Sequence, residues 1–178
     1  MVTTSVARFT VLTPNLIRLE YDSNGKFEDR QSTAIYNRKL SVPSFTNKSS
    51  NGVLTIITSD LTLTYTEGQD FTRSNLQIIG NVNGFKFTWI PSGSGPNTDN
   101  SISQNLFGTI RTLDGVSSPI TLNCSQLLQQ KKGYLHCTWS PFGRNGYALI
   151  NDTETAMLDE NWLSHTSNAN KYDWYLEK

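Results

Sequence analysis

The sequence predicts an all-β fold, an antiparallel β-sandwich with little helix, and three observations lead to this prediction. Apolar and polar residues alternate with a period of two along much of the chain. The alternating segments are short, and Gly, Asn, Asp, Ser or Pro residues separate them at intervals of roughly ten residues. No segment has a convincing helical period for more than two turns, with 125–132 as the only short candidate, so a parallel α/β sheet is disfavoured.

Two hairpins are the first predicted elements. They join residues 6–11 to 16–21, and residues 53–58 to 61–66. Thr13-Pro14-Asn15 separates the first pair and Ser59-Asp60 the second, and both segments have the composition of turns. β-Branched and aromatic residues are frequent in these strands, which suits a half-buried pleated surface. Further strands are predicted at 76–79, 85–90, 108–113, 135–139, 147–151 and 172–176.

The chain length bounds the number of domains. With 178 residues there is room for one domain with a real hydrophobic core, so we expect residues 1–178 to form a single β-sandwich domain. Residues 91–105 are polar, contain Gly and Pro, and have no period. We therefore expect them to form a flexible, exposed surface loop.

Charge and hydropathy argue against a nucleic-acid or membrane partner. The 15 basic and 15 acidic residues cancel, and basic residues are clustered no further than the pairs Arg38-Lys39 and Lys131-Lys132. The longest apolar stretches are only a few residues, and residues 1–5 have neither the basic nor the apolar part of a signal peptide. We expect a soluble chain without a signal peptide or transmembrane segment, and the composition assigns it to no compartment.

The sequence offers no convincing cofactor or metal site, so none is expected. It has no Gly-rich phosphate loop, no Gly-x-Ser-x-Gly nucleophile motif and no Cys/His dyad of credible spacing. His136 and Cys137 are neighbours on a predicted strand and face opposite ways, which argues against their sharing one ion with Cys124. The adjacent acidic pairs Glu28-Asp29 and Asp159-Glu160 are interpreted as solvated loop charge rather than as a catalytic pair.

Two features bear on export and leave it open. Cys124 and Cys137 would close a short disulfide loop in an exported protein, yet two cysteines do not make a disulfide framework. Glycan acceptor sequons begin at Asn47, Asn123 and Asn151, but a chain rich in Asn and Ser forms such tripeptides readily by chance.

Several ordered motifs resemble one family along nearly the whole chain. They are the opening run ARFTVLTPNLIRLEYDSNGKFEDRQS, then Tyr36-Asn37-Arg38, VPSF at 42–45, NLFGTIRTLDG at 105–115, CTW at 137–139, GYALINDT at 146–153 and finally Asp173-Trp174-Tyr175. Together these motifs resemble the N-terminal β-sandwich domain of glycoside hydrolase family 31, the α-glucosidase family. This domain is similar in fold to galactose mutarotase.

The resemblance implies a non-catalytic role. In that family the catalytic aspartates lie on a following (β/α)₈ barrel, and the sandwich packs on the barrel and lends a loop to the rim of its active site. We therefore expect a module that supports and partly lines a carbohydrate site, with carbohydrate or a catalytic barrel domain as its partner. An apolar face left uncovered would favour self-association. No catalysis is expected from these residues alone.

Two other functions are weighed against this one. The first is a free-standing carbohydrate-binding protein that uses the exposed face of the sandwich. The second is an enzyme of the mutarotase type, which requires a histidine and a carboxylate facing each other in a cleft. His136 is the only histidine on a predicted strand, so the carbohydrate-binding alternative is the stronger of the two.

Four residues are candidates for contact with carbohydrate or a barrel. Asp114 lies in the Leu-Asp-Gly turn, where it either caps its own backbone or faces a sugar hydroxyl, and Arg111 is a donor for a polar ligand or partner domain. Trp139 either packs in the core, which we favour, or stacks on a sugar ring. Arg144 opens the turn Arg-Asn-Gly-Tyr, which stands where the resembled family has Arg-Asp-Gly-Trp.

Overall fold

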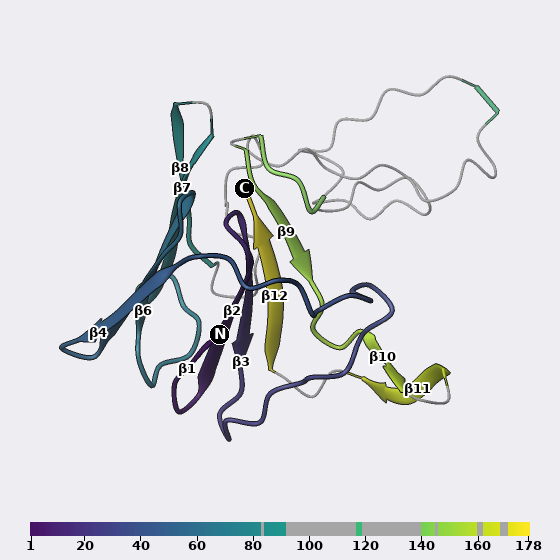
Figure 1. The fold of residues 1–178 in the computed structure, drawn as a ribbon. Helices are drawn as coiled ribbons and strands as arrows, with labels where there is room; N and C mark the ends of the chain where they lie inside the picture. Colours follow the sequence, from purple (N-terminus) through teal and green to yellow (C-terminus); the bar gives the residue numbers. More distant parts are fainter. Residues whose placement is uncertain (83, 92–116, 119–139, 145, 160–161, 168–170) are drawn as a thin grey trace.

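The computed structural model describes residues 1–82, 84–91, 117–118, 140–144, 146–159, 162–167 and 171–178. These residues form an antiparallel β-sandwich of two five-stranded sheets, together with a separate two-stranded hairpin (Figure 1). None of the described residues is helical. The predicted fold class is therefore confirmed. The strands predicted at 108–113 and 135–139, the helical candidate 125–132 and the loop at 92–105 lie outside the described residues.

The first sheet joins the two ends of the chain. Its strands lie in the order β1 (Val2–Thr3), β2 (Ala7–Thr13), β3 (Leu16–Tyr21), β12 (Tyr172–Glu177) and β9 (Ala148–Asn151). Every neighbouring pair is antiparallel. The central pair brings Trp174 opposite Leu19, so the last strand lies between the first hairpin and β9.

The second sheet is a simple meander. Its strands follow chain order as β4 (Thr46–Ser50), β5 (Val53–Ile57), β6 (Leu61–Thr66), β7 (Leu76–Val82) and β8 (Phe85–Trp89). Asn51 and Gly52 connect β4 to β5 with φ values of 53° and 74°. Two successive residues with positive φ form the type of turn that matches the twist of a two-residue hairpin, and Asn-Gly is the preferred pair there.

The core lies between the two sheets, where the apolar positions of the alternating strands face each other. Its largest fully buried side chains include Phe9, Ile17, Leu19, Ile56, Leu63, Tyr65, Ile78, Trp89 and Trp174. Phe71 adds to this core from the β6–β7 connection, and its ring centroid is 5.6 Å from that of Tyr65 and 5.6 Å from that of Trp174. The connection between β6 and β7 is thus anchored by an aromatic side chain.

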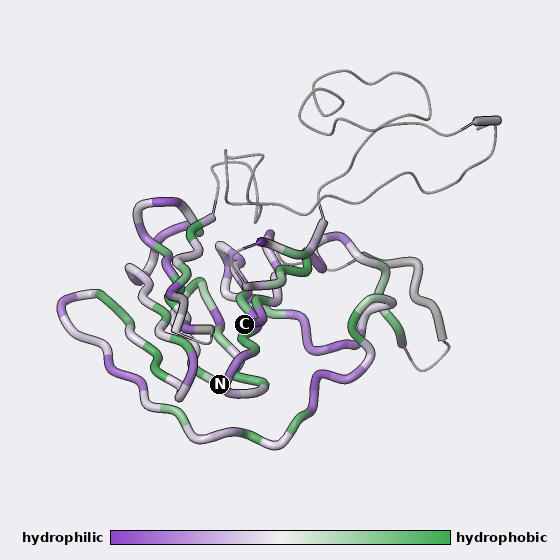
Figure 2. The backbone as a smooth tube through the Cα atoms, turned by 90° about the horizontal axis from the view of Figure 1, so that it is seen from above, coloured by the Kyte–Doolittle hydropathy of each residue, from purple (hydrophilic) through white to green (hydrophobic). Residues whose placement is uncertain are grey.

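A third layer covers the outer face of the first sheet. It consists of the hairpin of β10 (Ala156–Asp159) and β11 (Trp162–Ser167), which Figure 1 shows on the opposite side of the first sheet from the second, and of the first part of the extended segment 28–45, called the strap below. The strap joins the hairpin because Thr33 N donates to Ala156 O at 2.9 Å and Leu158 N donates to Gln31 O at 2.7 Å. From there it runs along the periphery to β4, with hydrophobic positions among hydrophilic ones (Figure 2).

Candidate functional site

The outer face of the first sheet carries charged side chains in a buried position. Arg8 on β2 lies opposite Glu20 on β3, and Glu20 lies opposite Asp173 on β12. Alternation along each strand places these residues on the face turned away from the apolar core. All three are buried, as is Arg18, which lies two residues before Glu20 on β3.

The charges on this face form paired hydrogen bonds. Arg8 donates from Nε to Glu20 Oε2 at 2.6 Å and from Nη2 to Oε1 at 2.7 Å. Arg18 donates from Nε to Asp173 Oδ1 at 2.9 Å and from Nη2 to Oδ2 at 2.6 Å. Bidentate guanidinium–carboxylate contacts of this kind are strong and directional, which suits a site where water is excluded. They provide hydrogen-bond partners for the buried carboxylates, whose desolvation would otherwise be costly.

The strap is bound to the sheet through the same arginines. The backbone oxygen of Glu28 accepts hydrogen bonds from Arg8 at 3.0 Å, Arg18 at 2.8 Å and Arg38 at 3.4 Å. Arg38, itself on the strap, pairs with Asp152 at 2.5 Å between Nη2 and Oδ2, and Ser32 Oγ donates to the other oxygen of Asp152 at 2.8 Å. We call Arg8, Arg18, Arg38, Glu20, Asp152 and Asp173 the arginine cluster.

Burial and pairing shift the pKa values of groups in the arginine cluster in opposite directions. Burial raises the pKa of Glu20 and of Asp152, against the opposing influence of their arginine and serine partners. For Arg18, burial favours the neutral form, but the hydrogen bond and charge of Asp173 outweigh it and raise the pKa. Three guanidinium groups therefore face three carboxyl groups in a charge-balanced layer under the strap.

Tyr175 lies between two members of the cluster. The guanidinium carbons of Arg18 and Arg38 are 5.6 Å and 6.0 Å from the centroid of its ring, within cation–π range. Burial raises the pKa of the Tyr175 hydroxyl. Its oxygen and Arg38 Nε are buried and have no hydrogen-bond partner among the described residues.

The strap has exposed apolar side chains among exposed polar ones. Tyr36, Leu40 and Val42 are 70%, 39% and 73% exposed, whereas Arg38 between them reaches inward to Asp152. We call these three side chains the strap strip. The segment that carries them has no regular secondary structure, and the arginine cluster and the β10–β11 hairpin bind it between residues 28 and 38.

The structure describes one of the four residues singled out from the sequence. Arg144 is exposed and lies in a turn in which Gly143 N donates to Tyr147 O at 2.9 Å, and its neighbour Phe142 is 56% exposed. Arg111, Asp114 and Trp139 lie outside the described residues. Trp174, whose ring could in principle stack on a sugar, is buried in the core.

The interpretation of Glu28-Asp29 as solvated charge is wrong for Glu28. That residue is buried, and its carboxylate accepts from the Arg30 backbone N at 2.9 Å and from Arg30 Nη2 at 2.7 Å, which lowers its pKa. Asp29 is 84% exposed at its side chain and pairs with Arg8 at 2.7 Å. The sequence analysis did not predict the arginine cluster, although Arg8, Arg18 and Glu20 lie on one face of the predicted hairpin at 6–21, which was a signal for it.

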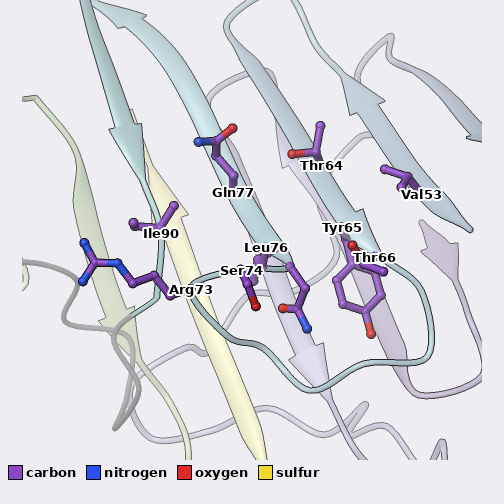
Figure 3. A pocket seen from close by; sticks show the side chains of 10 residues that line it. Val53, Thr64, Tyr65, Thr66, Arg73, Ser74, Leu76, Gln77 and Ile90 are labelled. Atoms are coloured by element: carbon purple, nitrogen blue, oxygen red, sulfur yellow. The ribbon is translucent and has the colours of Figure 1, made fainter.

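A second candidate site lies on the outer face of the second sheet. It is a hollow of about 200 Å³, and Figure 3 shows the side chains around it. A larger hollow of about 470 Å³ follows β4 and β5, with Thr46, Lys48 and Ile57 in its lining. Within the described ranges, no group of three or more His, Cys, Asp or Glu residues could hold a metal ion, and no helix is long and apolar enough to cross a membrane.

Comparison of the chain with models of protein families and with curated proteins found no match. The functional argument therefore depends on the residues and their geometry.

Proposed function

We propose that this chain is the non-catalytic N-terminal sandwich module of an α-glucosidase-like family 31 glycoside hydrolase. In this role it supports a (β/α)₈ barrel and partly lines the carbohydrate site of that barrel. The observation that carries the proposal is the strap strip, three exposed apolar side chains beside the part of the strap that the buried arginine cluster binds. Exposed apolar groups gathered on an otherwise polar segment are typical of surfaces that a partner covers.

The family-like motifs support the proposal because they meet in one place. They are spread from residue 7 to residue 175 along the chain, yet each of four supplies members of the arginine cluster. The opening run contributes Arg8, Arg18 and Glu20, the second motif Arg38, the GYALINDT motif Asp152, and the last motif Asp173. We expect such motifs to meet in one place if the function that all four share is to hold the strap against the sheet.

The carboxylates of the cluster are poorly suited to glycoside hydrolysis. A retaining glycosidase needs two carboxyl groups about 5 Å apart that reach the same glycosidic bond. Glu20, Asp152 and Asp173 are instead buried and held by arginines under the strap. We therefore expect the pure chain to hydrolyse no nitrophenyl α- or β-glucoside above the buffer rate. Turnover that disappears when one of its own carboxylates is replaced would contradict the non-catalytic role.

The direct test is association with a barrel. The chain is co-expressed with the barrel of a family 31 α-glucosidase from which the N-terminal sandwich has been removed. Co-purification of the two and hydrolysis of nitrophenyl α-glucoside are then measured. We expect a complex that is more active than the barrel alone. The double variant Tyr36→Ser/Val42→Ser should weaken it, because both side chains are largely exposed in the isolated chain and need a partner to be buried.

The matched control is Ile79→Ser. Ile79 is also exposed, but it lies on β7 of the second sheet, away from the strap. It should leave association unchanged. If the wild-type chain neither binds the barrel nor raises its activity, or if Ile79→Ser weakens binding as much as the strap variant, the proposal fails.

A further inference from the structure

The hollow in Figure 3 gathers polar side chains from several elements. Thr64 and Thr66 lie on β6 at positions that alternate with the buried Leu63 and Tyr65, and Gln77 on β7 is the cross-strand partner of Thr64. Arg73 and Ser74 come from the turn before β7, and Ile90 follows β8. In Figure 3, Arg73 and Ile90 lie at one end and Val53 at the other, with Gln77 and Thr64 between them.

The turn that carries Arg73 is fixed from both sides. Asn75 Nδ2 donates to Asp70 O at 2.6 Å, and Asn75 Oδ1 accepts from Thr72 N at 2.9 Å. Phe71 is buried in the aromatic core, and Lys171 pairs with Asp70 at 2.5 Å. The backbone at Arg73 is therefore already ordered without a ligand. This lowers the loss of conformational entropy that accompanies ligand binding at this site.

The hollow has an unbalanced positive charge. Arg73 is exposed and forms no ion pair with any residue that the structure describes, and the lining contains no carboxylate. The hydroxyls of Thr64, Thr66 and Ser74 and the amide of Gln77 each donate and accept hydrogen bonds. Ile90 and Val53 add apolar surface. This combination matches a ligand with one anionic group, several hydroxyls and an apolar ring face.

We propose that this hollow binds an anionic monosaccharide, a sugar ring that bears a carboxylate or a phosphate. Arg73 would pair with the anionic group, the threonine and glutamine side chains with ring hydroxyls, and Ile90 with the C–H face of the ring. The hollow has a volume of about 200 Å³ and is lined from three strands and the turn before β7, so one small ligand can contact all of these groups. The site is independent of the strap and goes beyond the supporting role proposed above.

The test is a titration of the full chain with four probes, followed by NMR shifts or calorimetry. These are glucuronate, glucose 6-phosphate, glucose and acetate. We expect saturable binding of glucuronate or glucose 6-phosphate, and the stronger of the two identifies the anionic group. Glucose and acetate should each bind at least about tenfold more weakly, because each lacks one half of the recognised chemistry.

Two variants locate the site. Arg73→Gln should weaken binding of the anionic sugar at least about tenfold, since it removes the charge-assisted contact. Lys86→Gln removes the same charge from an exposed position on the outer face of β8 outside the hollow, and it should leave binding unchanged. The proposal is overturned if neither anionic sugar binds, if acetate or glucose binds as well as they do, or if both variants weaken binding equally. None of these outcomes affects the barrel test of the strap.

Discussion

Arg18 and Asp173 form a bidentate ion pair across adjacent strands although 155 residues separate them in the sequence. The pair ties β3 to β12, and Arg18 also donates to the strap through Glu28 O. One guanidinium thus joins the beginning of the chain, its end and the layer above them. The contact therefore links the first sheet to the layer on its outer face.

Breaking this pair should cost more than most substitutions in the protein. We expect Arg18→Met to lower the free energy of unfolding by about 3–5 kcal/mol, because Asp173 would remain buried without its main partner. Arg18→Met/Asp173→Leu should recover part of the loss, since it removes both charges. Urea unfolding at neutral pH measures both. The control Arg73→Met, at an exposed arginine that forms no ion pair with any described residue, should cost less than about 1 kcal/mol, and an equal cost would contradict the special role of Arg18.

The strap should open when its own arginine is removed. Arg38→Met deletes the contacts to Asp152 and Glu28 O, so the strap loses its attachment at residue 38 and keeps the contacts of Glu28 O with Arg8 and Arg18. We expect faster hydrogen exchange and faster limited proteolysis in this segment, with little change in β5 and β6. Lys39→Met, at the exposed neighbouring position, is the control. Unchanged exchange in Arg38→Met would mean that Arg38 is not needed to hold the strap.

Stability should fall at alkaline pH in a manner that depends on Tyr65. Burial raises the pKa of this tyrosine to about 12, above the value of about 10 in an unfolded chain. The folded state therefore holds the proton more tightly, so its contribution is complete below about pH 10 and is lost as the pH rises toward about 12. We expect the stability advantage of wild type over Tyr65→Phe to shrink by about 2 kcal/mol over this range, as measured by urea unfolding. A constant difference would contradict the assignment.

Gly80 on β7 should not tolerate a side chain. A Cβ atom there would lie 2.3 Å and 2.4 Å from two ring carbons of Phe87, its buried cross-strand partner. Gly80→Ala should therefore lower the free energy of unfolding by about 1–3 kcal/mol through overpacking. Gly80→Ala/Phe87→Leu should lose less than the sum of its single variants, because the smaller side chain makes room. Full additivity in thermal or urea unfolding would show that the two positions do not interact.

Much of the sandwich follows from local sequence pattern. The predicted hairpins at 6–21 and 53–66 became β2–β3 and β5–β6, and Phe9, Ile56 and Leu63 face the core as alternation requires. The unpredicted β4, β10 and β11 have weaker patterns. Thr46–Ser50 is wholly polar and exposed, and it is a strand because it pairs with β5 across the Asn51-Gly52 turn. Pairing with a neighbour, rather than its own composition, determines such an edge strand.

The sequence by itself determined that this chain is an antiparallel β protein, which residues of its main strands face the core, and that no cofactor motif stands out. It did not determine whether the polar faces of the strands are exposed to solvent or covered by another part of the chain. Alternation predicts that Arg8, Arg18 and Glu20 lie opposite the core, but only the tertiary structure places the strap over them and brings Asp173 beside Arg18. A period of two is a property of each strand, whereas burial of a charge depends on partners from distant segments that offset its desolvation.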